Sequence, residues 1–417
     1  MGQAVATETD TGVSRFLAKR THPFAKTPLQ TEPARRVISL SQGTPDLPTP
    51  RHAIEAVEEY LASGTVYYTF HDGMPALREA IATKLRAQNG LDYDPATEIM
   101  VTAGAQEAMF VALFGTLDPG DEVIVPDPRY PVYDEVIQMV GGVVTSVPVD
   151  VEAGFLLDPR AIEAAVTERT KAILIISPDH PSGAVQPRAV LEAVGAIAER
   201  HDLLIYADEL YERFLFDGAE HVSVATLPGI KERTLTINGF SKAYAMTGWR
   251  VGYLALPASM KPALTVMKHA TSICAPAPSQ VAALAILTGP QEPLAEMMAE
   301  WGARRDYLHE RLATMGLPTR RTPGSYYVLA DVRQSGLDSR AFSAQLQAEE
   351  DVRVSPGRAF GEAGEGMVRM SFMTAMPDLA EGLDRLERFW TRSIGTHESS
   401  TARPETGHRE TGRNGVR

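Results

Sequence analysis

The stretch GFSKAYAMTGWRVGY, residues 239–253, decides how this chain is interpreted. It starts where the apolar run Leu235–Asn238 ends and leads into a second run, Val251–Ala255, and both runs are typical of short strands. Lys242 therefore follows a strand, beside Ser241 and eight residues before Arg250. A lysine amine held there can condense with an aldehyde, while the hydroxyl and the guanidinium can bind a phosphate on the same molecule. The alternative is an ordinary surface lysine.

Strand-like and helix-like patterns alternate on both sides of this stretch. Short apolar runs typical of strands lie at residues 98–102, 122–125, 143–148, 171–176, 203–207, 235–238 and 251–255. Helical apolar spacing occurs at residues 53–61, 76–88, 106–116, 131–139 and 187–200. Because such alternation implies crossover connections, we predict an α/β fold with a mostly parallel seven-stranded sheet between helices.

The pattern changes near residue 293. Helical spacing at residues 294–315, 339–349 and 377–389 is mixed with strand-like runs at residues 326–330 and 367–372, which predicts a smaller α+β domain. We expect a large domain over residues 50–292 and a small domain over residues 35–49 and 293–392. The polar segment 1–34 is expected to be a partly disordered arm, and 393–417, almost without large apolar residues, a disordered tail.

The composition argues against several classes of function. A net charge of −13 and a pI near 5.3 do not suit a protein that binds a nucleic-acid backbone. The single cysteine, Cys274, cannot form an intrachain disulfide. The first residues lack the apolar segment of a signal peptide, and no apolar run is long enough to cross a membrane. We expect a cytoplasmic protein that binds neither nucleic acid nor membrane, and we assign no residues to a metal.

The string ADELY, residues 207–211, ends another apolar run. A carboxylate at Asp208 can pair with a protonated pyridine nitrogen, which keeps the ring cationic and able to take up electrons. Tyr211 follows at a spacing that can reach a phenolic oxygen on the same ring. The alternative role for Asp208 is a helix N-cap.

Three further motifs occur where strands end or inside an apolar strand. Gly104, Ala105 and Gln106 form a small-residue turn that leads into a helix, whose first amides can bind phosphate. Tyr130, in a proline-rich loop, can stack on a ring or serve as a core tyrosine. Arg369 lies inside an apolar strand, where an unpaired charge is costly, so a substrate carboxylate or a structural salt bridge is its expected partner.

Together these motifs resemble the class I/II aminotransferases, enzymes of PLP fold type I that depend on pyridoxal 5′-phosphate (PLP), over roughly residues 35 to 392. The resemblance implies that Lys242 is the Schiff-base and proton-carrying lysine, that Asp208 pairs with the pyridine nitrogen and that Tyr211 bonds to the phenolic oxygen. The residues expected around the phosphate are Gly104, Ala105, Gln106, Ser241 and Arg250.

The resemblance also implies how the substrate, an amino acid, is bound. Tyr130 would stack on the PLP ring, Arg369 would bind the substrate carboxylate, and Gly43 would lie at the substrate mouth. Tyr68, in the string VYYTFHDG, matches a tyrosine that reaches the phosphate of the partner subunit. The expected assembly is therefore a homodimer with shared active sites.

One motif departs from the family pattern. The usual Asn-Pro-x-Asn-Pro-Thr-Gly is replaced by SPDHPSG at residues 177–183, so that His180 stands where an asparagine normally bonds to the phenolic oxygen. An imidazole can also take or give a proton near neutral pH. Either His180 still donates and the enzyme transfers an amino group to a 2-oxo acid, or the chemistry has shifted to elimination, decarboxylation or oxidative deamination of an amino-acid conjugate. A non-catalytic PLP-binding regulator is a third interpretation.

Overall fold

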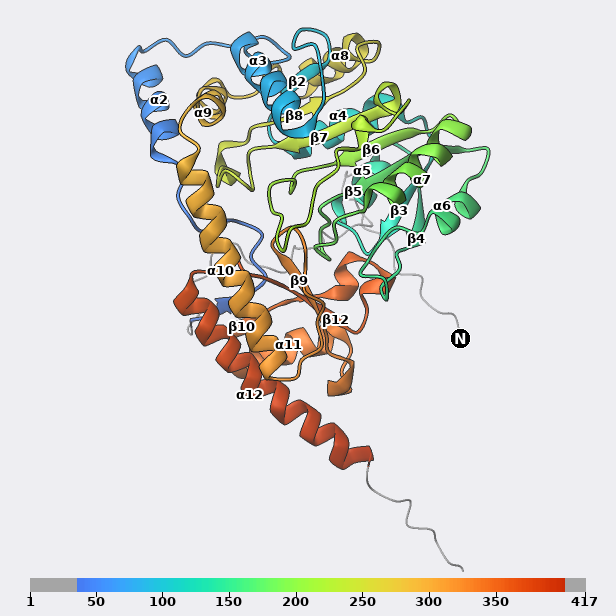
Figure 1. Cartoon of the computed structure of the whole chain (residues 1–417), viewed down its shortest axis with the longest axis vertical. Helices are drawn as coiled ribbons and strands as arrows, with labels where there is room; N and C mark the ends of the chain where they lie inside the picture. The colour runs from blue at the N-terminus through green and yellow to red at the C-terminus, as the bar shows by residue number, and fades with distance from the viewer. Residues whose placement is uncertain (1–35, 402–417) are drawn as a thin grey trace, which may run out of the picture.

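The computed structural model describes residues 36–401, with side chains through residue 394 (Figure 1). The predicted arm, residues 1–34, lies outside the described residues. A seven-stranded sheet has the spatial order β2 (Ile99–Thr102), β8 (Gly252–Ala255), β7 (Thr234–Gly239), β6 (Leu204–Asp208), β5 (Thr170–Ile176), β3 (Glu122–Asp127) and β4 (Val143–Pro148). β8 runs in the opposite direction to the other six strands of this sheet. The predicted fold class is confirmed.

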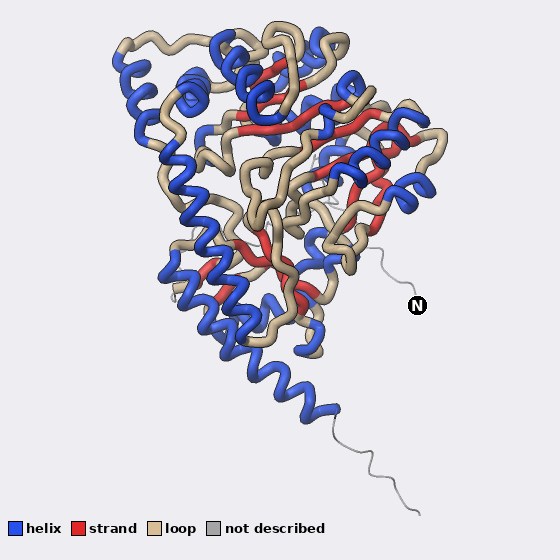
Figure 2. Tube along the Cα trace, in the orientation of Figure 1, coloured by secondary structure: helices blue, strands red, loops and turns tan. Residues whose placement is uncertain are grey.

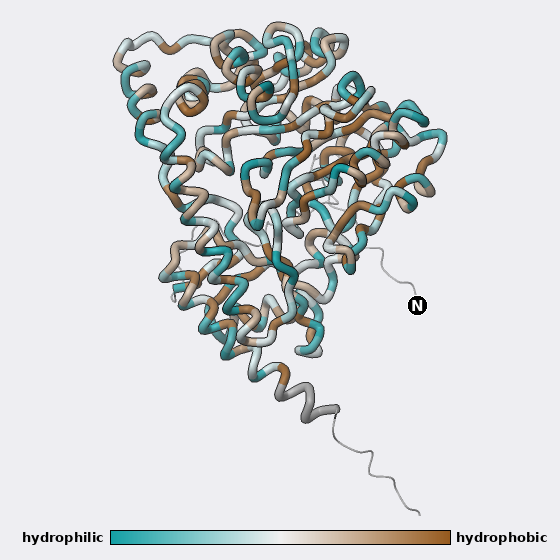
Figure 3. The backbone as a smooth tube through the Cα atoms, in the orientation of Figure 1, coloured by the Kyte–Doolittle hydropathy of each residue, from teal (hydrophilic) through white to brown (hydrophobic). Residues whose placement is uncertain are grey.

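Helices cover both faces of this sheet (Figure 2). The helices α4 (Ala105–Thr116), α5 (Val132–Met139) and α8 (Lys261–Ser272) pack on one face, and α6 (Pro159–Ala165) and α7 (Arg188–Arg200) on the other. Residues alternate between the two faces along each strand: Leu174 and Ile176 of β5 belong to the first core, and Ile173 and Ile175 to the second. Hydrophobic stretches accordingly lie along several strands of the large sheet (Figure 3).

The loops that follow the strands meet at one edge of the sheet. β2 is antiparallel to β8, which is antiparallel to β7, so β2 points the same way as the parallel strands. The carboxyl ends of β2, β3, β5, β6 and β7 therefore lie together and carry the predicted motifs. Such an edge is where open α/β sheets bind ligands.

A second body of structure packs beside this edge. It contains a sheet with the order β11 (Ser355–Pro356), β12 (Met367–Ser371) and β9 (Tyr327–Asp331), and a parallel pair of β1 (Ile38–Ser39) with β10 (Val352–Arg353). Its helices are α11 (Ser339–Glu350), α12 (Met376–Thr401) and the lower part of α10 (Glu292–Thr314), which runs down from the large sheet (Figure 1). We propose that this body and residues 50–292 are the two domains predicted from the sequence.

Several helices are not apparent from the sequence pattern, namely α6 and α8, named above, and α9 (Ala277–Thr288). α9 is apolar on most sides because it is buried against α2 (Arg51–Ala62) and α3 (Pro75–Lys84), so it has no polar face to mark a helical period. Within residues 36–401, no helix is long and apolar enough to cross a membrane.

The prediction of a disordered tail over residues 393–417 is wrong for its first part. Helix α12 continues to Thr401, nine residues beyond the expected end of the small domain at residue 392. Ser393 donates its hydroxyl hydrogen to the carbonyl of Phe389 at 2.9 Å, and Ile394 packs on the hydrophobic core, so the buried face of the helix extends into the segment. Residues 402–417 lie outside the described part of the chain.

Candidate active site

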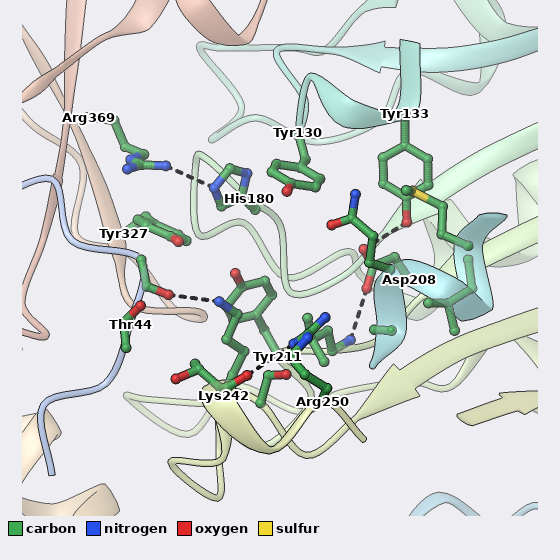
Figure 4. Close-up of a pocket in the computed structure, with 18 of the residues that line it drawn as sticks. Thr44, Tyr130, Tyr133, His180, Asp208, Tyr211, Lys242, Arg250, Tyr327 and Arg369 are labelled. Atoms are coloured by element: carbon green, nitrogen blue, oxygen red, sulfur yellow. Dashed lines mark hydrogen bonds between the residues drawn. The ribbon is translucent and has the colours of Figure 1, made fainter. Parts of the chain in front are cut away.

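A cavity of about 400 Å³ lies at the carboxyl edge of the large sheet, next to the second body (Figure 4). The structure brings eleven of the predicted site residues to this cavity: Gly43, Ala105, Gln106, Tyr130, His180, Asp208, Tyr211, Ser241, Lys242, Arg250 and Arg369. They come from segments spread over more than three hundred residues of sequence, and they meet because the strand-end loops and the second body converge here.

Lys242 lies in the turn after β7 and points into the cavity. Its amine donates a hydrogen bond to the carbonyl oxygen of Gly43 at 2.7 Å. Burial lowers the pKa of Lys242, with the nearby Arg369 and Arg250 charges acting in the same direction. A buried amine with a lowered pKa is more available as a nucleophile and as a base than a surface lysine.

Asp208 is the last residue of β6, and its carboxylate is held on two sides. Its Oδ2 accepts a hydrogen bond from the Tyr133 hydroxyl at 2.8 Å, and its Oδ1 accepts one from the backbone N–H of Leu210 at 3.1 Å. Burial raises the pKa of Asp208, so a cationic N–H in the cavity would stabilise the charged form. Turns, not a helix, follow Asp208, so the helix N-cap alternative is wrong.

One wall of the cavity is suited to an anion. Helix α4 begins at Ala105 without a side-chain cap, so its first amides are free to bind a ligand. Gly104 has φ +82°, and a Cβ atom there would lie 2.5 Å from Nη2 of Arg250, which shows how closely the guanidinium packs on this turn. With Ser241, these groups offer the backbone, hydroxyl and guanidinium donors that a phosphate requires. The donor set therefore fits a phosphorylated pyridine aldehyde such as PLP.

Arg369, on β12, reaches the cavity between two aromatic rings. Its guanidinium carbon lies 4.3 Å from the ring centre of Tyr327 and 4.7 Å from that of Phe360. It donates from Nη1 to Nε2 of His180 at 2.9 Å and from Nη2 to the carbonyl of Ser41 at 2.8 Å. Its Nε is buried and has no partner among the described residues, so it remains available to a carboxylate ligand.

The contact with Arg369 fixes the protonation of His180. A guanidinium only donates hydrogen bonds, so Nε2 is the accepting nitrogen and the proton of the neutral ring is on Nδ1. Burial lowers the pKa of His180 well below its usual value, and the charges of Arg369 and Lys242 lower it further. Nδ1 has no partner among the described residues, so it can donate to a ligand. In this arrangement His180 is a neutral imidazole that accepts from Arg369 at Nε2 and carries its hydrogen on Nδ1.

Two predicted residues are not among those that line the cavity. Gly104 contributes instead through its contact with Arg250. Tyr68 is 79% exposed, in the loop between α2 and α3, and does not line this chain's cavity. The sequence analysis missed the remaining lining residues: Ser41, Thr44, Met109, Tyr133, Leu210, Ile237, Thr247 and Tyr327. Of these, Tyr133 lies near the start of α5, only three residues after Tyr130, so its closeness in sequence to a predicted site residue could have suggested it.

Fold and cavity together define a class of protein: an α/β enzyme with a buried lysine, a buried carboxylate and an anion-binding helix end around one small-molecule site. The sequence model of the family described as aminotransferase class I and II matches residues 35–386. The chain is 41% identical to an aspartate aminotransferase of Pyrococcus abyssi over 354 residues, 84% of this chain and 91% of that protein. It is 38% identical to the arginine–pyruvate transaminase AruH of Pseudomonas aeruginosa, over 86% of this chain and 91% of that protein.

A solved structure agrees with these relatives. The aromatic aminotransferase from Pyrococcus horikoshii OT3 superposes with a TM-score of 0.83 at 40% identity, covering 85% of this chain and 96% of that one. The chain therefore belongs to the class I and II aminotransferases, a family of PLP enzymes, and it is an aminotransferase. The names of these three proteins refer to an acidic, a basic and an aromatic amino acid, respectively. What the three names share is amino-group transfer.

Proposed function

We propose that this chain holds PLP in the cavity through Lys242 and there moves the amino group of an amino acid to a 2-oxo acid. The observation that carries the proposal is the grouping of the Lys242 amine, the buried Asp208 carboxylate, the anion-binding turn before α4 and Arg369 around one cavity. A regulator that only bound PLP would need the phosphate donors but not a carboxylate-binding arginine beside the lysine.

PLP, when bound, supplies an aldehyde for exchange of amines and a ring that takes up the electron pair left by a bond broken at the substrate Cα. Asp208 would keep a proton on the ring nitrogen, and Tyr211 would donate to the phenolic oxygen. Arg369 binds the substrate carboxylate and so orients the Cα–H bond toward Lys242. The Lys242 amine, whose pKa burial lowers, would take that proton from Cα and later give it to the carbon on the other side of the substrate nitrogen.

We infer that His180 supports this transfer by holding Arg369. Its accepting Nε2 and its strongly lowered pKa favour the interpretation in which His180 only forms hydrogen bonds. The named relatives are all transaminases, which supports the same interpretation over elimination, decarboxylation or oxidation.

Absorbance and product analysis test the proposal. Purified protein with PLP should show a visible imine band, which should disappear on adding the right amino acid as a keto acid accumulates. Lys242→Ala should lose both the band and turnover, whereas Lys171→Ala, a control at an exposed lysine of β5, should keep them. Full turnover by Lys242→Ala, or release of ammonia or carbon dioxide in place of the keto acid, would overturn the proposal.

We further propose a homodimer in which Tyr68 of one subunit completes the phosphate site of the other. The loop before α3 exposes Tyr67 at 77%, Tyr68 at 79% and Phe70 at 65%, an aromatic group that a second copy would cover. Mixed dimers of Lys242→Ala and Tyr68→Ala subunits test this. If sites are shared, each mixed dimer regains one intact site, so a refolded equimolar mixture should recover about a quarter of wild-type activity. No recovery, or a monomer by light scattering, would contradict the shared site.

A further inference from the structure

Tyr326 lies immediately before β9 and is fully buried, yet it is not among the family's motifs identified in this sequence. Its hydroxyl donates to the carbonyl oxygen of Gly43 at 2.6 Å. The amine of Lys242 donates to the same oxygen at 2.7 Å. A carbonyl oxygen has two lone pairs, so both hydrogen bonds form together. Gly43 O is therefore a shared acceptor that joins Tyr326 to Lys242.

The position of the Tyr326 hydroxyl is fixed from several sides. Its ring packs edge-on against Tyr211 and Phe214, each with ring centres 5.2 Å away. Its oxygen accepts a longer hydrogen bond, 3.4 Å, from the hydroxyl of Tyr327. Gly43 is confined as well, because a Cβ atom on it would lie 3.1 Å from the Tyr327 hydroxyl oxygen. Packing therefore restricts the movement of both groups in the Tyr326–Gly43 hydrogen bond.

We propose that Tyr326 is a positioning residue for the proton transfer by Lys242, acting through the carbonyl oxygen of Gly43. The inference rests on the proposed function, in which the Lys242 amine is free when it takes the Cα proton. A neutral amine has two hydrogens and one lone pair. When one N–H is held by Gly43 O, the rotation of the amine is restricted and its lone pair is kept directed at the substrate. The lone pair takes the Cα proton, which becomes the third hydrogen of an ammonium group and is the one returned.

The variant Tyr326→Phe removes one oxygen atom and keeps the ring packing. The assay is steady-state transamination with an amino acid that carries hydrogen or deuterium at Cα. We expect kcat to fall about tenfold, as for the loss of one hydrogen bond acting on the transition state, with KM changed by less than about threefold. The kinetic isotope effect on kcat should rise, because proton transfer becomes more fully rate-limiting.

Tyr206→Phe is the matched control. Tyr206 is also fully buried, and its hydroxyl bonds to that of Thr116 at 2.6 Å, away from the cavity. It should leave kcat and the isotope effect within about twofold of wild type, since only stability is affected. If Tyr326→Phe behaves like Tyr206→Phe, or raises KM with an unchanged isotope effect, the positioning role is wrong. Wild-type protein that takes up no PLP would instead overturn the proposed function itself.

Discussion

Removal of the His180 imidazole, which accepts a hydrogen bond from Arg369, should raise KM for the substrate more than it lowers kcat. In His180→Leu the guanidinium loses its bond to Nε2 and keeps those to Ser41 and Ser355. A buried hydrogen bond to a charged group contributes about 1.5–3 kcal/mol. If that energy serves to hold Arg369 for the substrate carboxylate, KM for the amino acid should rise roughly tenfold to 150-fold.

Two further variants at position 180 separate the two ring nitrogens. The amide oxygen of His180→Gln can reach the place of Nε2, and that of His180→Asn lies nearer the place of Nδ1. We therefore expect His180→Gln to restore KM to within about fivefold of wild type and His180→Asn to restore it less. Ser355→Ala is a control that should raise KM less than His180→Leu does, because it removes only a longer hydrogen bond, 3.2 Å, from Arg369 to a hydroxyl group.

The assay compares an amino acid with the corresponding amine that lacks the carboxylate. Only the amino acid uses Arg369, so His180→Leu should lower kcat/KM for the amino acid at least about tenfold more than kcat/KM for the amine. An equal loss with both substrates would refute the reasoning, as would a fall in kcat at unchanged KM, which indicates an acid or base role. A change of product in any of these variants would revive the elimination or decarboxylation interpretation.

Three other substitutions test the surroundings of the site. Burial raises the pKa of Asp179 to about 7, so the folded protein favours the protonated carboxyl. The stability that Asp179 contributes is therefore fully present below its unfolded pKa near 4 and is lost as the pH rises through 7. In urea unfolding of the PLP-free protein, the free energy of unfolding should fall by about 2–3 kcal/mol between pH 5 and pH 8, and Asp179→Asn should remove this fall. Lys84→Met leaves the buried carboxylate of Glu212 without its ion-pair partner and should cost about 3–5 kcal/mol in the same assay, where a loss under about 1 kcal/mol would contradict the pairing. Gly104→Ala places a methyl group against Arg250 at a positive φ and should weaken PLP binding about tenfold in a fluorescence titration, with an unchanged circular dichroism spectrum; unaltered affinity would show that the turn is not part of the phosphate site.

Local sequence was enough to predict the large sheet and the motifs that contribute eleven of the nineteen residues lining the cavity. Strand β5 has buried residues on both faces, so it reads as an apolar run, and β6 ends at Asp208 as the run LLIYAD indicates. Lys242 and Arg250 could be placed because a short motif after a strand has its neighbours within a few residues. The helix α9 was missed because burial on most sides removes the polar face that reveals a helical period.

The contacts between the two bodies of the protein were decided only by tertiary structure. His180 and Arg369 are 189 residues apart, and no spacing along the chain brings them to 2.9 Å. The same holds for Tyr326 and Lys242, which meet at the carbonyl of Gly43. Periodicity reports which side of an element is buried, whereas the partner of a buried polar group depends on how whole elements pack. The sequence therefore determined the fold of the chain and the positions of Lys242 and Asp208 at the ends of strands. The packing of the elements determined which groups hold these side chains in place.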